Sequence, residues 1–537
     1  MRRFLSAAEN PSPPKALPSK QTWILLLGIL LFSCIVRIPL ANIPLERDEG
    51  EYAYIAWRWN QGEVPYIHTF NQKFPLVFLI YRFILRYVGE TPSAIHWAMQ
   101  FWVIVILLAI FVLGRFLISD QAGLIAAAFS AFLLPDASVF GQSANTEIFL
   151  ILPATLGFLF TLYALREKSW AFSLAAGFCL SLATLCKQTA VLYFLFACIA
   201  IAMNPGAGAL FSGLAVGASI PLVGLIYYFH SVGALKAVWE CAVLYNWQYT
   251  QVNAWGDYWW YFWQWLTPHL RDFWIVDTLA LSFLLQTTYA GAPLIGWFVL
   301  SCAAISAGGY FRPHYFTLVI PSLSLMAAWQ IVKIPWRRLF PRIKVAHALA
   351  ALFIVQSISL REEGWYYFHF VKKEDPTLVL YETTHFAGAQ AIAALIRRQT
   401  KPDDTVFIFG HEPEILFYAK RVSASRYIYL YPLMIPSKSA LERQYELFSE
   451  LREHAPKMVV TFFQPKEKEL NGGPTYMFDA LKRFLPEYGY HVHALAVSNN
   501  QDGYDFIVGA DAIKTWNKAP SWPDDWLAPY KVVLWSK

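Results

Sequence analysis

Long apolar runs separated by short polar segments fill the chain from about Thr22 to Glu362. A helix needs about 20 consecutive apolar residues to cross the hydrocarbon core of a bilayer. Runs of this length, or nearly so, begin near Thr22, Trp97, Gly123, Glu147, Ala171, Thr189, Leu210, Phe273, Pro293, Phe316 and Val345. The pattern therefore predicts a polytopic α-helical membrane protein with about eleven transmembrane helices.

The first apolar run predicts a membrane helix that is retained in the mature chain. The stretch from Thr22 to Leu40 is longer than the apolar core of a typical signal peptide, and no small-residue cleavage pattern follows it. We therefore expect residues 1–21 to form a tail and residues 22–362 to form a transmembrane domain. Residues 41–96 are then the first long segment between membrane helices.

The pattern changes after about Glu374, where the apolar runs become shorter. Strand-like and helix-like runs alternate there, namely 387–398 (helix), 405–410 (strand), 457–463 (strand) and 477–485 (helix). This alternation predicts that residues 374–537 fold as a soluble α/β domain beside the transmembrane domain.

The distribution of Lys and Arg predicts the orientation of the chain in its membrane. Cytoplasmic loops carry an excess of these residues. The N-terminal tail is basic, and residues 333–344 form the most basic short loop of the chain. Placing both in the cytoplasm puts the segment 41–96 and the α/β domain on the outer side of the cell membrane.

Composition supports a membrane protein and excludes several other classes. Hydrophobic residues make up 57% of the chain and charged residues 15%, whereas soluble proteins carry about a quarter charged residues. The net charge of +6 is accounted for by the basic loops, so no nucleic-acid partner is expected. The six cysteines show neither metal-ligand spacing nor a disulfide framework. The 22 Trp suit interfacial belts or sugar stacking, and the aromatic segment 244–265 is either an interfacial helix that closes a site or part of such a belt.

Acidic residues stand at two points beside predicted membrane helices. Asp48 and Glu49 follow the first helix closely, and Glu147 stands at the mouth of a later one. Carboxylates so close to a membrane surface are costly unless they are solvated, paired or used. Glu147 taken alone also fits an ordinary acid in the first turn of a helix.

Cationic residues stand at similar points. Lys73 precedes an apolar stretch, Lys187 lies between two predicted helices, and Arg312 and His314 lie before another. Each has an ordinary explanation, such as a snorkelling side chain, but under the predicted topology all lie on the outer side with the acids. A carboxylate can remove a proton from an attacking hydroxyl, and cations can stabilise a departing phosphate. The set therefore suits transfer from a lipid-linked phosphate.

Residues 22–335 resemble the GT-C glycosyltransferases of family 39, which are related to the protein O-mannosyltransferases and the aminoarabinose transferase of lipid A. The resemblance is carried by Asp48-Glu49 followed by Tyr52-Ala53, by Lys73-Phe74-Pro75 where the family has Lys-Pro-Pro, by Lys187, and by Arg312, Tyr315 and Pro321. The family has an Asp where this chain has Glu147.

The resemblance implies roles for these residues. Asp48 would be the general base with Glu49 beside it, and Glu147 would position the acceptor or the base. Lys73 and Arg312 would hold the donor phosphate, with Lys187 as a further candidate. The remaining contacts to donor or acceptor would come from Tyr52, His314 and Tyr315. No cofactor is expected. No metal is expected either, because Gln72 precedes Lys73 at a position where an acidic residue would help to hold a metal ion.

The expected function is inverting transfer of one sugar from a polyprenyl-phosphate donor to a hydroxyl of an exported protein, lipid or cell-envelope glycan. Three alternatives remain: a transporter or flippase of a lipid-linked saccharide, a glycan ligase, and a non-catalytic membrane scaffold. A transporter is expected to carry polar groups along the middle of several helices. Here the ionisable residues gather at one predicted face, which favours surface chemistry.

Overall fold

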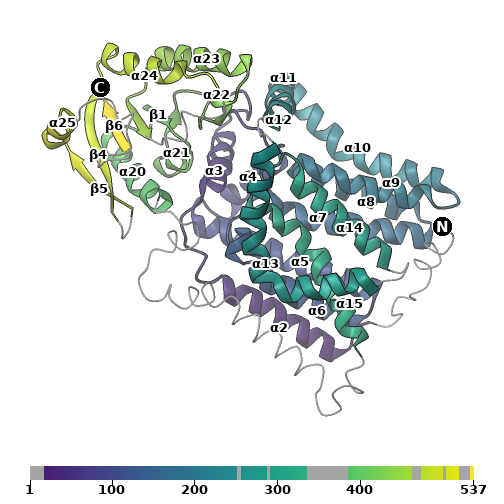
Figure 1. Cartoon of the computed structure of the whole chain (residues 1–537). Coiled ribbons are helices and arrows are strands. Elements are labelled where there is room, and N and C mark those ends of the chain that lie inside the picture. Colours follow the sequence, from purple (N-terminus) through teal and green to yellow (C-terminus); the bar gives the residue numbers. More distant parts are fainter. Residues whose placement is uncertain are drawn as a thin grey trace.

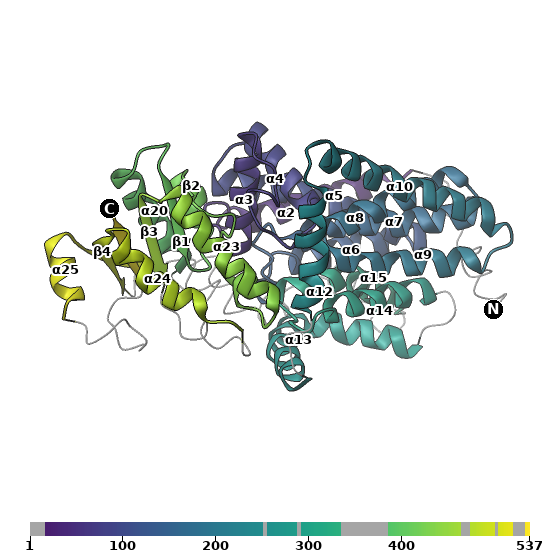
Figure 2. The same ribbon diagram turned by 90° about the horizontal axis from the view of Figure 1, so that it is seen from above.

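The computed structural model describes residues 17–250, 255–286, 291–334, 385–462, 473–499, 503–518 and 532–537. Two parts lie side by side, a helical part that ends at residue 334 and an α/β unit that begins at residue 385 (Figure 1). Seen from above, α3 (Arg47–Asn60) and α4 (Leu76–Tyr87) lie between them (Figure 2). The span predicted from Val345 and nearly all of the basic loop 333–344 lie outside the described residues.

Five helices of the described part are long and apolar enough to cross a membrane. They are α2 (Lys20–Arg37), α5 (Pro92–Leu117), α7 (Thr146–Glu167), α10 (Ala207–Ser231) and the continuous pair η5 (Pro313–Val319) and α15 (Ile320–Lys333). Shorter apolar helices are α6 (Asp120–Leu133), α8 (Trp170–Cys186), η2 with α9 (Gln188–Ala202) and α14 (Ala292–Ser306). These helices begin near the predicted positions, and the number of eleven spans stays a prediction.

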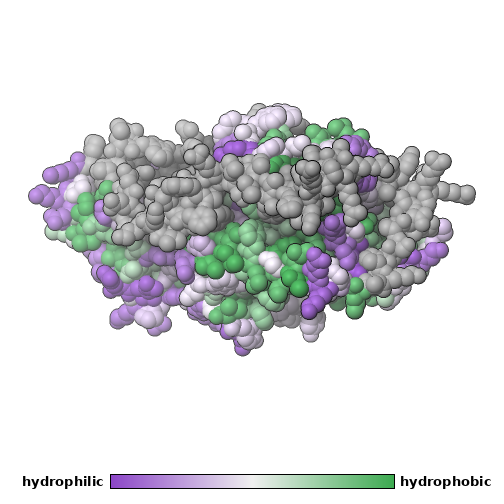
Figure 3. All heavy atoms as spheres, turned by 90° about the horizontal axis from the view of Figure 1, so that it is seen from below, coloured by the Kyte–Doolittle hydropathy of each residue, from purple (hydrophilic) through white to green (hydrophobic). Residues whose placement is uncertain are grey.

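Some of these helices are mostly buried within the protein, and others expose much of their apolar surface. In the most apolar 18-residue stretch of α7, 78% of the residues are buried within the protein, whereas in α2 the share is 22%. The exposed side chains of α2 are apolar, including Ile24, Leu27 and Ile35. Figure 3 shows hydrophobic residues over the helical part and hydrophilic residues more often over the α/β unit. An apolar exposed surface on a helix with internally satisfied backbone groups is suited to lipid.

Short elements connect these helices. They are η1 (Ala137–Val139), α11 (Leu235–Val238), the π-helix η3 (Trp239–Leu244) and α12 (Tyr245–Tyr249). The long helix α13 (Trp255–Gln286) has 32 residues and packs against α15. The predicted aromatic segment 244–265 therefore falls on the end of η3, on α12 and on the start of α13, with residues 251–254 outside the described residues.

The α/β unit is built on one mixed sheet with the strand order β2-β1-β3-β6-β4-β5. Its strands are β1 (Thr405–Phe409), β2 (Val422–Ser423), β3 (Met458–Phe462), β4 (His491–Asn499), β5 (Gly503–Val508) and β6 (Val532–Ser536). β1 pairs in parallel with β2 and β3, and the other pairs are antiparallel. The last strand, β6, lies inside the sheet with Val532 to Leu534 fully buried, so the end of the chain is part of the core.

In the described part of this unit, six helices accompany the sheet: α20 (His385–Gln399), α21 (Glu414–Ala419), α22 (Tyr431–Met434), α23 (Lys438–His454), α24 (Tyr476–Glu487) and α25 (Ala510–Trp516). The four runs predicted as helix or strand in this region are α20, β1, β3 and α24, and each has the predicted conformation. These short patterns sufficed because α20 and α24 each bury one face, while the continuous apolar runs of β1 and β3 are almost wholly buried.

The two parts are joined mainly through α3. A Cβ atom on Gly50 would lie 2.6 Å from the Cα atom of Glu414, so only glycine permits α3 to lie this close to α21. The backbone N–H of Ser423 donates to the Tyr54 hydroxyl at 2.8 Å, and that of Leu45 donates to a hydroxyl of α21 at 2.8 Å. The α/β unit therefore rests directly on the helix that carries Asp48.

Candidate functional site

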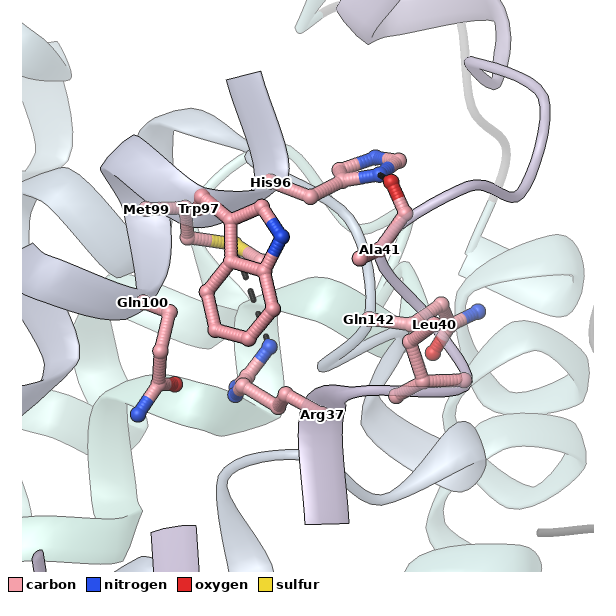
Figure 4. A pocket seen from close by; sticks show the side chains of 8 residues that line it. All are labelled: Arg37, Leu40, Ala41, His96, Trp97, Met99, Gln100 and Gln142. Carbon is pink, nitrogen blue, oxygen red and sulfur yellow. Dashed lines mark hydrogen bonds between the residues drawn. The ribbon is translucent and has the colours of Figure 1, made fainter. Parts of the chain in front are cut away.

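The segment between α2 and α3 is anchored at both of its ends. The guanidinium of Arg37 donates to the carbonyl oxygens of Gly141 at 2.8 Å and Leu134 at 3.1 Å. His96 points toward Ala41 and hydrogen-bonds its carbonyl through Nδ1 at 3.0 Å (Figure 4). A buried arginine satisfied by carbonyl oxygens keeps its charge hydrogen-bonded inside the protein, and here it fixes the approach to α3.

Glu49 ties the start of α3 to its surroundings. Its carboxylate accepts hydrogen bonds from the backbone N–H groups of Glu46 at 3.1 Å and Ala144 at 2.7 Å, and Nε2 of His96 lies 3.1 Å away. The side chain is fully buried and closes a capping box on α3. The structure thus places Glu49 behind the site, where it positions the helix, and not in the cavity with Asp48.

A cavity of about 250 Å³ lies where α3, the loop before α4, η5 and the α/β unit meet. Five of the residues singled out in the sequence line it: Asp48, Lys73, Arg312, His314 and Tyr315. Its wall also contains Glu46, Arg47, Glu51, Gln72, Phe140, Tyr249, Phe386, Tyr429 and Tyr431. The cavity is therefore the candidate active site.

Asp48 lies in the first turn of α3 with 26% of its side chain exposed. Its Oδ2 accepts a hydrogen bond from the Tyr52 hydroxyl at 3.3 Å and lies 3.9 Å from Nζ of Lys73. Burial lowers the pKa of Lys73, but the charge of Asp48 and other nearby groups raise it further, so the pKa ends above its ordinary value and the lysine is a cation. Tyr52 is fully buried and does not line the cavity, so in this structure it holds the carboxylate in place.

The backbone around Lys73 is held rigidly. Its N–H donates to Oδ1 of Asn71 at 2.8 Å. The preceding carbonyl, that of Gln72, accepts hydrogen bonds from the side-chain amides of Gln188 at 2.9 Å and Asn246 at 2.6 Å. The lysine therefore enters the cavity from a fixed point, which reduces the conformational entropy lost when it binds an anion.

Glu147 and Lys187 form a buried ion pair beside the cavity. Nζ of Lys187 donates to Oε1 of Glu147, and the Thr146 hydroxyl donates to Oε2 at 2.7 Å. Nζ also lies 3.3 Å from the centre of the Tyr315 ring, and Nε2 of His314 lies 4.0 Å from Oε1 of Glu147. The charge of Lys187 is matched by Glu147, so this pair supports His314 and Tyr315 from behind.

Arg312 reaches the cavity after a sharp turn. Gly308 and Gly309 have φ angles of 90° and 72°, which glycine adopts without strain. The guanidinium lies 5.8 Å from the Tyr310 ring. Among the described residues, Arg312 makes no ion pair with a carboxylate, so it is the cation of the wall most available to an anionic ligand.

Sequence reasoning missed much of the cavity wall. Glu51 stands three residues after Asp48, so both lie on one face if this segment is a helix. This spacing is the signal in the sequence that could have identified Glu51. Tyr429 and Tyr431 come from a different part of the chain and have no local signal. Within the described ranges, no group of three or more His, Cys, Asp or Glu residues is arranged to hold a metal ion, and the expected absence of a metal stays a prediction.

Comparison with known proteins gives the architecture. The family model described as dolichyl-phosphate-mannose-protein mannosyltransferase matches residues 72–232. The solved structure of ArnT from Cupriavidus metallidurans bound to undecaprenyl phosphate has a TM-score of 0.60 at 14% sequence identity, covering 96% of this chain and 98% of that one. The chain has the GT-C fold. No curated protein matches it in sequence.

The GT-C likeness includes the α/β unit as well as the membrane helices. ArnT from the same organism in the apo state has a TM-score of 0.55 at 13% identity, covering 95% of this chain and 97% of that one. The chain is thus a multi-pass membrane protein similar to protein mannosyltransferases and ArnT. The matched segment 72–232 contains Lys73, Glu147 and Lys187 but ends before Arg312.

Proposed function

We propose that the chain is a membrane glycosyltransferase that moves one sugar from a polyprenyl-phosphate donor to a hydroxyl of an exported acceptor. The observation that carries this proposal is the carboxylate of Asp48 in one cavity with the cations Lys73 and Arg312. The cavity adjoins both the membrane helices and the α/β unit, so a lipid-linked donor and a water-soluble acceptor can both reach it. The likeness to GT-C proteins supports the same reaction class.

The reaction can be written with the groups of the cavity. The acceptor oxygen attacks the anomeric carbon and passes its proton to Asp48, which acts as general base. The bond from the anomeric carbon to the phosphate oxygen breaks, and its electron pair stays on the phosphate. One negative charge thus leaves the carboxylate and appears on the phosphate. Lys73, which neutralises Asp48 at 3.9 Å before transfer, is then free to bind the phosphate with Arg312.

Direct displacement inverts the anomeric centre, and the cavity favours this course. A retaining route through a covalent intermediate needs a second, ionised carboxylate as nucleophile. Burial, reinforced by the charge of Asp48, raises the pKa of both Glu46 and Glu51 well above the usual range. Burial therefore favours the protonated carboxyl group at both positions, and a protonated carboxyl group is a poor nucleophile.

The size of the cavity favours a single sugar. Pockets for drug-sized ligands span roughly 300–1,000 Å³, and this cavity has about 250 Å³. A monosaccharide with its phosphate suits this volume better than the long glycan that a ligase transfers. We place the cavity and the α/β unit on the outer side of the membrane because the basic loops predict a cytoplasmic N-terminus.

The test uses purified protein in liposomes, a panel of labelled polyprenyl-phosphate sugars, and an extract of exported acceptors. We expect transfer from one donor, a drop of about 100-fold or more in Asp48→Asn, and an inverted product by NMR. Asp403→Asn, which changes an exposed carboxylate, should transfer normally. Equal transfer by Asp48→Asn would overturn the role of Asp48. Movement of the labelled lipid across the bilayer without sugar transfer would instead show that the protein is a flippase.

A further inference from the structure

The proposed reaction leaves part of the cavity wall without a role. Asp48 serves as base, and Lys73 and Arg312 serve the phosphate. The carboxyl group of Glu51 and the phenol groups of Tyr429 and Tyr431 line the same cavity but take no part in proton transfer or phosphate binding. These groups are available to contact the sugar.

Glu51 is fixed in relation to the reacting groups. It lies one turn of α3 beyond Asp48 and is 6% exposed. Asn71 donates to Oε1 of Glu51 through its amide nitrogen and accepts from the Lys73 N–H through its amide oxygen at 2.8 Å. One side chain therefore sets both the carboxyl group and the phosphate-binding lysine. Burial raises the pKa of Glu51 well above the usual range, which favours the protonated carboxyl group, and this group can donate one hydrogen bond and accept others.

The two tyrosines are held in place by contacts between the α/β unit and the helical part. The backbone N–H of Phe70 donates to the Arg426 carbonyl at 2.7 Å, and the Phe70 ring stacks on Tyr427 with centres 5.5 Å apart. These contacts fix the segment that leads to Tyr429 and Tyr431. The Tyr431 ring is packed against the His411 ring at 4.4 Å, so it is a rigid aromatic surface with a polar tip, which suits a sugar ring.

We propose that Glu51, Tyr429 and Tyr431 form a sugar subsite that selects an uncharged sugar with free hydroxyl groups and rejects sugar acids. This inference rests on the proposed function, because it assigns the sugar end of the same donor. The carboxyl and phenol groups both donate and accept hydrogen bonds, as hydroxyl groups require. Removing a hydroxyl from the sugar leaves these buried groups unpaired, which costs affinity.

Charge accounts for the rejection of sugar acids. A carboxylated sugar would place a second negative charge beside Asp48 and the phosphate. Lys73 is paired with Asp48 at 3.9 Å, and Arg47 faces Glu412 of the α/β unit at 4.0 Å, while Arg312 serves the phosphate. Each cation of the described wall thus already faces an anion or serves the phosphate, and like charges brought together inside a site are costly.

The experiment compares four kinds of polyprenyl-phosphate donor with one acceptor: a neutral hexose, its uronic acid, its amino sugar, and a series of monodeoxy forms. We expect the wild type to use the hexose about 30-fold or more better than the uronic acid in kcat/KM. At least one deoxy form should be about tenfold worse than the hexose. In Glu51→Ala, KM for the hexose should rise about tenfold with a smaller change in kcat. In the same variant, the difference in kcat/KM between the hexose and that deoxy form should disappear.

Matched variants separate this inference from the proposed function and from misfolding. Glu51→Gln keeps the shape and should retain most of the selectivity, and Glu453→Ala, at an exposed site of the α/β unit, should match the wild type. Tyr431→Phe, which removes only the hydroxyl group, should raise KM for the hexose, and Tyr431→Ala should raise it further, which tests the subsite if Glu51→Ala does not fold. An inactive wild type would overturn the proposed function itself. Two outcomes with an active wild type would overturn the subsite alone. In the first, the loss of kcat/KM for the deoxy donor is the same in every variant as in the wild type. In the second, the wild type prefers the uronic acid or the amino sugar.

Discussion

Nζ of Lys73 lies 3.9 Å from Oδ2 of Asp48, and both groups line one cavity between the membrane helices and the α/β unit. This spacing is too long for a strong hydrogen bond but short enough for an electrostatic pair. The lysine can therefore stabilise the carboxylate before proton transfer and still turn to a phosphate afterwards. In the proposed reaction, one cation thus serves two anions in succession.

Replacing Lys73 should slow the chemical step. In Lys73→Met we expect kcat at saturating donor to fall about 100-fold. The reason is that the variant loses the preorganised positive charge that stabilises the leaving phosphate. Lys73→Arg should keep part of the rate. The measurement is sugar transfer in liposomes, with Lys236→Met as control because that lysine is exposed on α11. A Lys73→Met protein within twofold of the wild type would remove Lys73 from the mechanism.

Replacing Lys187 should affect stability more than donor binding. Lys187→Met leaves the buried Glu147 without its partner, which we expect to destabilise the protein by about 3–5 kcal/mol. The double variant Glu147→Gln with Lys187→Met should recover most of this loss, because no unpaired charge remains. Thermal unfolding in detergent measures both. A stable Lys187→Met protein with a raised KM for donor would instead support Lys187 as a phosphate ligand.

Gly50 should be intolerant of even a methyl group. An added Cβ would lie 2.6 Å from the Cα of Glu414, so Gly50→Ala must push α3 away from α21 and should cost about 1–3 kcal/mol. Activity should fall as well, because α3 carries Asp48. Gly28→Ala is the control, since a Cβ there meets nothing within 4 Å. Equal melting temperatures for both variants would show that the contact is not tight.

The contact between α21 and α3 should weaken as pH rises. Burial, followed by the charge of Glu412, raises the pKa of Glu414 to about 8, well above its value in an unfolded chain. The folded state therefore holds a proton that the unfolded state releases above about pH 4.3. The contribution of Glu414 to stability is therefore fully present below that pH and is lost as pH rises toward 8, at up to about 1.4 kcal/mol for each pH unit.

Glu414→Gln should flatten this dependence, because the amide stays neutral at every pH. We expect the variant to melt higher than the wild type at pH 8 and at a similar temperature at pH 5. Glu453→Gln, at an exposed position, should follow the wild-type curve. Parallel curves for the wild type and Glu414→Gln between pH 5 and 8 would show that Glu414 does not titrate in this range.

Local sequence pattern was enough to predict the main elements of the fold. The apolar runs near Thr22, Glu147 and Leu210 coincide with α2, α7 and α10, and the alternating runs after residue 385 coincide with α20, β1, β3 and α24. The apolar runs of the membrane helices and of the strands, and the alternation of apolar and polar residues in α20 and α24, are visible within each element itself. The eleven spans and the outer position of the α/β unit stay predictions, because they depend on the membrane and on residues outside the described ranges.

Local sequence pattern also predicted which residue types the site needs, since acids and cations beside membrane helices are costly without a use. It did not distinguish Asp48 from Glu49, which are neighbours in the chain. About 100° of helix rotation separates consecutive residues, and only the packing of α3 turns Asp48 to the cavity and Glu49 to His96 and Ala144. The packing of α7 against α8 joins Lys187 to Glu147.

The sequence alone thus determined the membrane helices, the α/β composition of the C-terminal part, and the charged residues that the proposed chemistry requires. Tertiary structure decided which of them face one cavity and which support it from behind. It also brought Tyr429 and Tyr431 to Glu51, across more than 350 residues of chain. The physical reason is that helix and strand periods are set by neighbours in the chain, whereas the partners of a buried side chain are set by how distant elements pack together.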